Sequence, residues 1–502
     1  MNYLCRRIRH EKIQLFTTPN NAIQVPNHLH FNMNKNFPLG IGYIAAVLER
    51  EGYKVQPVDA LVEGWNNVEQ IAPNKIRLGL SDEAIKKRIL AFEPDMVGIS
   101  SLFTMQTENV IHLSKLVKQV NPDITVVVGG ANASALPEVL IQDECIDFVV
   151  MGEGEHRLLT LIKTLEKGGE ELEDMDGIAY KVSGNIHVRP NTRLISDLDS
   201  LPFPARHLFD MEKYFGAASS HGIRTHNRFA SIITSRGCPL QCTFCTAHKT
   251  WGRRYRMRSP ENVLSELELL VTKYGVKEIL FEDDNLTMHK KRAIRIFDMM
   301  IERKLNLAWD TPNGVAVCAL DEKVLDRMKE SGCYHVNFAI ESGSQRVLRE
   351  VIKKPVNLKR VSELTRYGKF IGLDVGCFVV FGMPGETIEE MKETIRYVRK
   401  QRFSNVHIAV ASPLPGSELY ELCKEKGYLT DGFSPFNPPI IDYHIQTPDW
   451  SRNEIERFIE KEKIKLLIYQ QIINPKNIAG FLKKGLSYVV KKSFNFAKVL
   501  IK

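Results

Sequence analysis

The first 165 residues alternate short apolar, β-branched runs with amphipathic helical patterns. The candidate strands are residues 12–16, 53–58, 95–100, 124–130 and 147–151, and the candidate helices are residues 40–52, 81–92 and 107–120. Near-continuous apolar strands between amphipathic helices are typical of a parallel sheet that is covered on both faces. The pattern therefore predicts a doubly wound α/β domain over residues 1–165.

A second alternating series follows a looser segment, residues 166–227, which we interpret as a linker with some hairpin content. Its apolar runs are residues 229–235, 277–283, 307–311, 335–340, 373–382 and 405–411. Ser259 and Pro260 fit the N-cap and the first position of the first helix in this series. Six strand–helix units fall short of the eight in a closed barrel, so we predict a partial (β/α)6 barrel over residues 228–425.

Composition and charge describe an ordinary globular protein. The 502 residues are 43% hydrophobic and 25% charged, and no uncharged apolar run reaches the roughly 18 residues that a membrane span needs. The formal charge of +8 resides at the end of the chain, because residues 463–502 hold nine lysines and no Asp, Glu or Arg. A nucleic-acid groove in the body is therefore not indicated.

Three cysteines lie within eight residues, at Cys238, Cys242 and Cys245, just after the first strand of the second series. A structural zinc site needs four ligands, and the chain has no second CxxC or HxxxH pair, with His248 the only local candidate. A [4Fe-4S] cluster held by three thiolates leaves one iron open for a substrate or cofactor. The spacing favours such a cluster over zinc or three core cysteines, at the strand end where α/β sites form.

The CxxxCxxC motif and the segments around it resemble the radical S-adenosylmethionine (SAM) superfamily. Residues 277–285, 335–344, 381–387 and 412–420 resemble that family's segments after the second, fourth, fifth and sixth strands. The resemblance implies that the open iron binds the amino and carboxylate groups of SAM. It also implies SAM contacts at Phe244, Asp283, Asp284, Glu341, Ser342, Pro384 and Gly385.

The first domain has no GxGxxG after its first strand, which argues against a dinucleotide site. Three of its strand ends resemble the flavodoxin-like or Rossmann-like cobalamin-binding domain of corrinoid methyltransferases. The resemblance implies cobalamin contacts at Asp59, Leu61, Gly64, Ser100, Leu102, Gly129, Gly130 and Gly152. Leu61 stands where that family has its cobalt-ligating histidine, and this loss is typical of cobalamin-dependent radical SAM enzymes, whose domain order also matches.

The combined resemblance, over roughly residues 10–425, implies an anaerobic methyltransferase of the class B type with a [4Fe-4S] cluster, SAM and cobalamin. The cluster would cleave SAM to a 5′-deoxyadenosyl radical, which takes hydrogen from the substrate. Methylcobalamin would then methylate an unactivated carbon, and a second SAM would restore its methyl group. A small-molecule or lipid substrate and an electron donor such as ferredoxin or flavodoxin are the expected partners.

Several alternatives remain open from the sequence. A relative with the same cofactors could catalyse cyclisation, oxidation or rearrangement without methyl transfer. A tRNA methylthiotransferase would need a second set of cluster cysteines, and the first domain holds only Cys5 and Cys145. A non-catalytic corrinoid or metal-binding sensor would not need the SAM-facing motifs. The remaining cysteines are expected in the core and are Cys318, Cys333, Cys377 and Cys423.

Residues 426–502 read as irregular and then helical, and they end in a basic amphipathic stretch. Its lysines recur close to every seventh residue, while Leu482, Val489 and Phe496 share that spacing on another face. Such a helix either lies on an anionic membrane surface or packs on the barrel with its lysines in solvent. With no signal peptide at the start, we expect a cytoplasmic protein, with peripheral membrane contact as one option.

Overall fold

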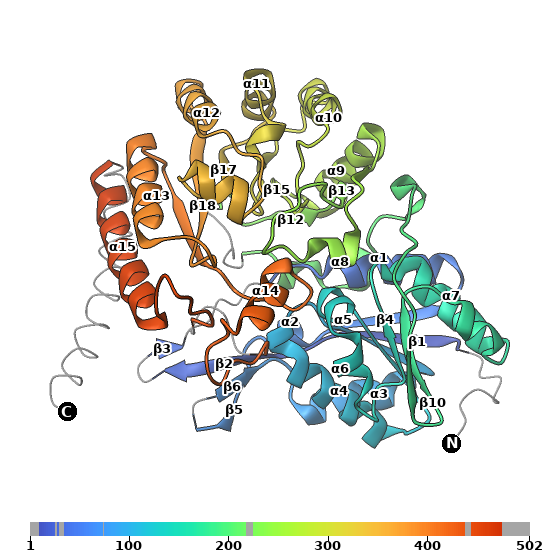
Figure 1. Ribbon diagram of the computed structural model, residues 1–502. Coiled ribbons are helices and arrows are strands. Elements are labelled where there is room, and N and C mark those ends of the chain that lie inside the picture. The colour runs from blue at the N-terminus through green and yellow to red at the C-terminus, as the bar shows by residue number, and fades with distance from the viewer. Residues whose placement is uncertain are drawn as a thin grey trace.

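The computed structural model describes residues 10–25, 28–29, 35–73, 75–216, 224–436 and 443–473. Two α/β units follow each other along this part of the chain (Figure 1). The first unit, coloured blue to teal, is built on a seven-stranded sheet. Its strands, in spatial order, are β11 (Asn185–Val188), β10 (Ile178–Val182), β9 (Phe148–Val150), β8 (Thr125–Gly129), β7 (Met96–Ser100), β1 (Lys12–Thr17) and β4 (Lys54–Asp59).

Helices cover both faces of this sheet, as predicted. One face is buried by α3 (Asp82–Phe92), α4 (Thr107–Val120) and α6 (Pro137–Ile141). The other is buried by α1 (Leu39–Arg50) and α7 (Gly154–Glu166). Each helix presents an apolar stripe to a nearly continuous apolar strand, which confirms the doubly wound architecture.

The sheet is mixed rather than wholly parallel. The five predicted strands are parallel neighbours, but β10 and β11 form a hairpin that joins β9 in the antiparallel sense. This hairpin lies in the predicted linker. A two-strand hairpin on its own is only marginally stable, so pairing with an existing edge is its favourable state.

A second small sheet was not foreseen. Its antiparallel strands, in order, are β3 (His28–Leu29), β2 (Asn20–Val25), β6 (Lys75–Leu78) and β5 (Val68–Ala72). The strands depart from the carboxyl ends of β1 and β4, where loops of a doubly wound sheet surround a ligand site. Every residue of β5 is exposed, so it lacks the apolar alternation from which strands are predicted.

The second unit is the predicted partial barrel. Its six parallel strands form two three-stranded sheets, joined by single bridges between Trp309 and Cys333 and between Val315 and Phe338. The strands are β12 (Phe229–Ile232), β15 (Glu278–Phe281), β16 (Ala308–Asp310), β17 (His335–Glu341), β18 (Asp374–Phe381) and β19 (Val406–Val410).

An arc of helices lies outside these strands (Figure 1). The helices are α9 (Pro260–Tyr274), α10 (Lys290–Glu302), α11 (Glu322–Glu330), α12 (Leu358–Phe370) and α13 (Ile388–Gln401). Helix α14 (Glu418–Lys426) lies apart from this arc, toward the first unit (Figure 1). The predicted start of α9 is confirmed, since Ser259 accepts a hydrogen bond from the Asn262 amide and Pro260 opens the helix. Gly275 ends it in the left-handed conformation.

The last described helix, α15 (Arg452–Ile473), packs against α13. Within the described ranges, no helix combines the length and the apolar character that crossing a bilayer requires. The basic amphipathic stretch, residues 474–502, lies outside the described residues.

Candidate functional site

The three clustered cysteines lie in a loop closed by a two-residue antiparallel ladder. The ladder pairs β13 (Ser235–Arg236) with β14 (Arg256–Met257), and α8 (Ala247–Trp251) lies inside the loop. Gly237 begins the loop at a φ of 83°, and a Cβ there would lie 2.4 Å from the Arg254 carbonyl oxygen. Glycine is required at this turn because other residues rarely adopt the conformation and would clash.

The three thiols are half-buried and lie within electrostatic range of one another. Burial raises the pKa of all three, and that of Cys242 to about 11. Iron would therefore have to displace a proton from each thiol on binding.

The donor set suits an iron–sulfur cluster. In the described part of the chain, no three Cys, His, Asp or Glu side chains converge on one point as the ligands of a single ion would. A [4Fe-4S] cluster makes a different demand, because each thiolate binds its own iron at a corner of the cluster. Three thiols in one loop, with soft sulfur donors, fit that demand.

A buried ion pair lies beside the cysteines. The Lys354 ammonium donates to Glu341 at 2.7 Å, and both lie within electrostatic range of Cys242. Burial by itself would lower the pKa of Lys354, but Glu341 together with Cys242 and Cys238 outweighs burial, so the pKa is raised. Glu341 ends β17 at a φ of 66°, where the pairing with β18 slips by one residue. This strained backbone turns the carboxylate toward Lys354.

Sequence analysis identified Glu341 but missed Lys354. Lys353 and Lys354 are adjacent identical residues, and no local pattern distinguishes them. In the fold, Lys353 binds the exposed Glu418 while Lys354 is 7% exposed. The burial that selects Lys354 is a tertiary effect.

The two aspartates of the predicted SAM segment have different surroundings. Asp283 accepts hydrogen bonds from Thr234 and Ser235, at 2.6 and 2.7 Å, and so fixes the start of the cysteine loop. Asp284 is within electrostatic range of Cys238. Its Oδ2 atom is buried without a hydrogen-bond partner among the described residues. Burial, and then the Asp283 charge, raise the pKa of Asp284 to about 6. Of the two aspartates, Asp284 is the one whose charge acts on Cys238 and Cys245.

The other predicted SAM residues lie at the carboxyl ends of the barrel strands. Phe244, between the second and third cysteines, packs on the edge of the barrel core. Ser342 is fully buried and hydrogen-bonds Thr394 of α13, so the hydroxyl faces a helix. Pro384 is buried, and the Gly385 carbonyl accepts a hydrogen bond from Arg346 at 2.7 Å.

The residues predicted to bind cobalamin gather at one edge of the first sheet. They follow β4, β7, β8 and β9, whose carboxyl ends share that edge because the four strands are parallel. Gly129, Gly130 and Ser100 are half-buried, Gly152 is buried, and Leu102 is exposed.

Asp59 and Gly64 hold the loop in which Leu61 stands. Asp59 accepts hydrogen bonds from Thr17, from the Val62 amide and from the hydroxyl of Tyr214, at 2.8, 3.1 and 2.9 Å. Burial raises the pKa of Asp59. A Cβ on Gly64 would lie 2.1 Å from the backbone of Gly79, so only glycine allows this contact with the residue that follows β6. Leu61 itself is half-buried in the short helix α2 (Ala60–Glu63).

The two groups of predicted residues are neighbours in space. Helix α5 (Ala131–Ala135), which directly follows Gly129 and Gly130, packs on α8, which directly follows Cys245. The edge of the first sheet and the cysteine loop therefore face each other across a domain contact.

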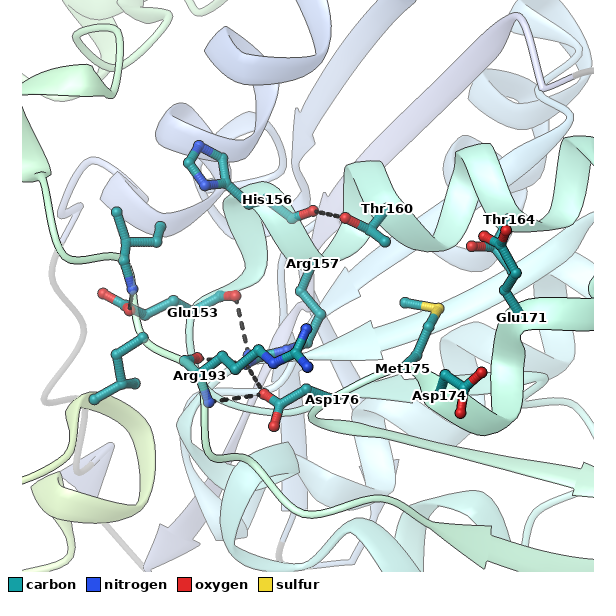
Figure 2. A pocket seen from close by; sticks show the side chains of 12 residues that line it. Glu153, His156, Arg157, Thr160, Thr164, Glu171, Asp174, Met175, Asp176 and Arg193 are labelled. Atoms are coloured by element: carbon teal, nitrogen blue, oxygen red, sulfur yellow. Dashed lines mark hydrogen bonds and ion pairs between the residues drawn. The ribbon is translucent and has the colours of Figure 1, made fainter.

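A pocket of about 460 Å³ lies beside α7, along the segment that follows it (Figure 2). Its charged lining includes Glu153, His156, Arg157, Glu171 and Asp176. The lining contains none of the predicted cofactor residues.

Comparisons with known proteins agree with this arrangement. The family model described as "B12 binding domain" matches residues 34–162, and "Radical SAM superfamily" matches residues 232–398. A cytidylyl-2-hydroxyethylphosphonate methyltransferase of Streptomyces wedmorensis is 38% identical over 456 residues, 85% of each chain. An uncharacterized methyltransferase of Pyrococcus horikoshii is 36% identical, over 87% of this chain and 89% of that protein. An anaerobic magnesium-protoporphyrin IX monomethyl ester cyclase of Rubrivivax gelatinosus is 29% identical, over 80% of this chain and 68% of that protein.

Two solved structures share the fold. The radical SAM methyltransferase TsrM of Kitasatospora setae, with cobalamin and a [4Fe-4S] cluster bound, has a TM-score of 0.67. The match covers 86% of this chain and 82% of that chain at 17% identity. The cobalamin-dependent radical enzyme OxsB has a TM-score of 0.68, covering 91% of this chain and 66% of that chain, also at 17% identity.

Proposed function

The chain belongs to the radical SAM superfamily, in the group that carries a B12-binding domain before the barrel, and on that premise we propose the reaction and the residues that serve it. The enzyme is a cobalamin-dependent radical SAM methyltransferase that methylates an unactivated carbon of a small-molecule or lipid substrate. The observation that carries the proposal is the packing of α5 on α8, which brings the two predicted cofactor edges together. Methyl transfer between two cofactors requires this proximity.

We assign the cofactors as follows. Residues 1–165 bind cobalamin and residues 228–425 bind the cluster and SAM, with residues 166–227 between them and 426–502 after them. Cys238, Cys242 and Cys245 hold the cluster. SAM contacts Phe244, Asp283, Asp284, Glu341, Ser342, Pro384 and Gly385. Cobalamin contacts Asp59, Leu61, Gly64, Ser100, Leu102, Gly129, Gly130 and Gly152.

When bound, the cluster and SAM supply the one-electron cleavage that releases a 5′-deoxyadenosyl radical, and cobalamin supplies the methyl group. The protein positions these groups. Lys354 holds Glu341 next to Cys242, where Glu341 would accept hydrogen bonds from the SAM ribose, the role that the resemblance implies for it. Leu61 has no donor atom, so a cobalamin held at this edge would receive no cobalt ligand from this side chain, which would favour the lower oxidation states of the metal.

The reaction type can be tested without the substrate. Protein reconstituted anaerobically with iron, sulfide and cobalamin receives SAM and a low-potential reductant, and S-adenosylhomocysteine, methylated cobalamin and 5′-deoxyadenosine are quantified. We expect S-adenosylhomocysteine and methylated cobalamin to accumulate together. If 5′-deoxyadenosine alone appears, methyl transfer is refuted, and cyclisation, oxidation or rearrangement replaces it.

The proposal also includes an electron donor and a membrane contact. A low-potential donor of the ferredoxin or flavodoxin kind supplies electrons to the cluster. The lysine spacing in residues 474–502 supports peripheral contact with an anionic membrane and a hydrophobic or lipid substrate. Flotation with anionic vesicles, comparing the full chain with one truncated at Asn474, tests this contact. Equal flotation of the two proteins refutes it.

A further inference from the structure

Four buried charged residues join the two domains: Glu153, Glu155, Arg236 and Arg256. Their side chains are between 1% and 5% exposed. Arg236 donates to Glu153 at 2.8 Å and to Glu155 at 2.6 Å. Arg256 donates to both oxygens of Glu153 at 2.8 Å. Two positive and two negative charges thus form a neutral group, which we call the clamp.

The clamp holds the base of the cysteine loop. Arg236 and Arg256 are direct cross-strand partners in the two-residue ladder that closes this loop, and Arg236 lies two residues before Cys238. Glu153, which receives hydrogen bonds from both arginines, comes from the other domain. It follows Gly152 at the sheet edge that is proposed to bind cobalamin. The clamp therefore connects the residue that follows the proposed cobalamin edge to the two residues that open and close the cysteine loop.

Neighbouring groups restrict the clamp to this geometry. Glu153 also accepts a hydrogen bond from the Ile195 amide at 2.7 Å, and Arg256 donates to the Ile195 and Trp251 carbonyls. The guanidinium of Arg236 lies over the rings of Tyr43 and Trp251, at 5.4 and 4.8 Å from their centroids. The two domains therefore meet in one specific orientation at this point.

Arg157, which lines the pocket beside α7 together with Glu153, fixes the backbone around Glu153 (Figure 2). Arg157 donates to the backbone carbonyls of Met151 and Glu153 and to the Asp176 carboxylate, and not to the Glu153 carboxylate. The side chain of Glu153 is thereby left for the two arginines of the cysteine loop. Arg157 fixes the backbone, and Arg236 and Arg256 engage the carboxylate.

Stability alone does not account for such a group. Apolar residues of similar volume are often as stabilising as a buried ion cluster, because the charges lose their hydration. What the bidentate, charge-assisted hydrogen bonds do add is geometric specificity. Reactions between groups held by two different domains depend on such specificity, since misplacement by about 1 Å can cost about 100-fold in rate.

We propose that the clamp sets the distance and orientation between the cysteine loop and the cobalamin edge, and that Glu155 and Arg236 are positioning residues for methyl transfer. The inference rests on the proposed function. Cleavage of SAM to 5′-deoxyadenosine needs only the barrel, whereas methyl transfer between SAM and cobalamin needs both domains in register. A loosened clamp should therefore slow methyl transfer between SAM and cobalamin and leave the cleavage of SAM to 5′-deoxyadenosine unchanged.

The main test uses Glu155→Gln in the full chain, reconstituted with cluster and cobalamin. The variant keeps the side-chain shape and removes the negative charge that faces Arg236. We expect S-adenosylhomocysteine formation to fall about tenfold or more, as for other residues that orient cofactor ligands, with 5′-deoxyadenosine formation within about twofold of wild type. Glu155→Asp, which retains the charge, should recover part of the loss. The matched control is Glu51→Gln. It removes an exposed ion pair between Glu51 and Lys163, and Lys163 lies on α7, the helix that also carries Glu155.

A geometric readout accompanies the assay. Electron paramagnetic resonance of the protein with a reduced cluster and cob(II)alamin reports the magnetic coupling of the two spins, which weakens steeply with distance. We expect faster spin relaxation of cob(II)alamin in the wild type and in Glu51→Gln, and a partial loss of this enhancement in Glu155→Gln.

Two results overturn the clamp proposal. In one, Glu155→Gln keeps both the wild-type ratio of S-adenosylhomocysteine to 5′-deoxyadenosine and the wild-type relaxation. In the other, Glu155→Gln and Glu155→Asp both lose bound iron, so the charges serve the folding of the cysteine loop. A wild type that makes no S-adenosylhomocysteine refutes the proposed function instead, and the spin coupling still decides the role of the clamp.

Discussion

Glu266→Gln is the most direct test of how the predicted linker is attached to the barrel. Glu266 is fully buried on α9 and accepts from Arg206 at 2.6 Å and from Arg258 at 2.5 Å. Burial alone would raise the pKa of Glu266, but the two guanidiniums outweigh it and hold the pKa below its usual range. Arg206 comes from the segment interpreted as a linker, so this triad fixes that segment to the barrel.

The expected loss of stability follows from the hydrogen-bond donors and acceptors of the glutamine side chain. An amide has one acceptor oxygen and an NH₂ group, so one of the two arginines would lose its acceptor and face another donor. Removing one partner of a buried ion pair costs about 3–5 kcal/mol. For a domain of about 150–250 residues, about 2–4 °C in Tm corresponds to each kcal/mol, so Tm should fall by about 6–20 °C.

Scanning calorimetry of the protein at neutral pH measures this shift. Glu212→Gln is the control, because Glu212 forms an exposed pair with Arg228, and exposed pairs contribute little. The reasoning is refuted if Glu266→Gln melts within about 2 °C of the control, since a buried charge without its partner costs more than that.

The other predictions concern the cofactors and pH. Alanine in place of Cys238, Cys242 or Cys245 should abolish 5′-deoxyadenosine formation, and chromatography of the products would detect any that remains. Leu61→His should place a nitrogen donor below cobalt, so the electron paramagnetic resonance spectrum of cob(II)alamin should gain nitrogen splitting; an unchanged spectrum would place Leu61 away from the metal. Burial raises the pKa of Glu386 to about 8, so the folded state binds a proton that the unfolded state has lost above about pH 4.5. Stability therefore falls as pH rises toward 8, and Glu386→Gln should flatten that decline in a Tm-versus-pH series, whereas an unaltered slope would mean that another group causes it.

The sequence was sufficient wherever the governing forces are local. Alternation of apolar runs with amphipathic helices predicted both units, and the pairing of Ser259 with Pro260 predicted the start of α9. The cysteine spacing together with the resemblance predicted the family and its cofactors. These features depend on residues that are close in sequence, so they can be predicted without knowledge of the fold.

Tertiary structure decided which of several equivalent residues faces the site. Asp283 and Asp284 are adjacent and alike, yet Asp283 fixes the loop by hydrogen bonds and the charge of Asp284 acts on the cysteines. The same holds for Lys353 and Lys354. Their roles depend on burial and on the nearby backbone, which the order of residues alone does not contain.

The connections between domains were also invisible in sequence. Arg236 and Glu155 are 81 residues apart, and Arg206 and Glu266 are 60 apart. In an unfolded chain such charges are hydrated, and the electrostatic interaction between them is weak. Only when the fold removes water from them does each require its specific partner. The sequence by itself thus determined the two domains and their cofactor chemistry, and the tertiary structure decided how the domains are held together, because the pairing of buried charges is a property of distant residues.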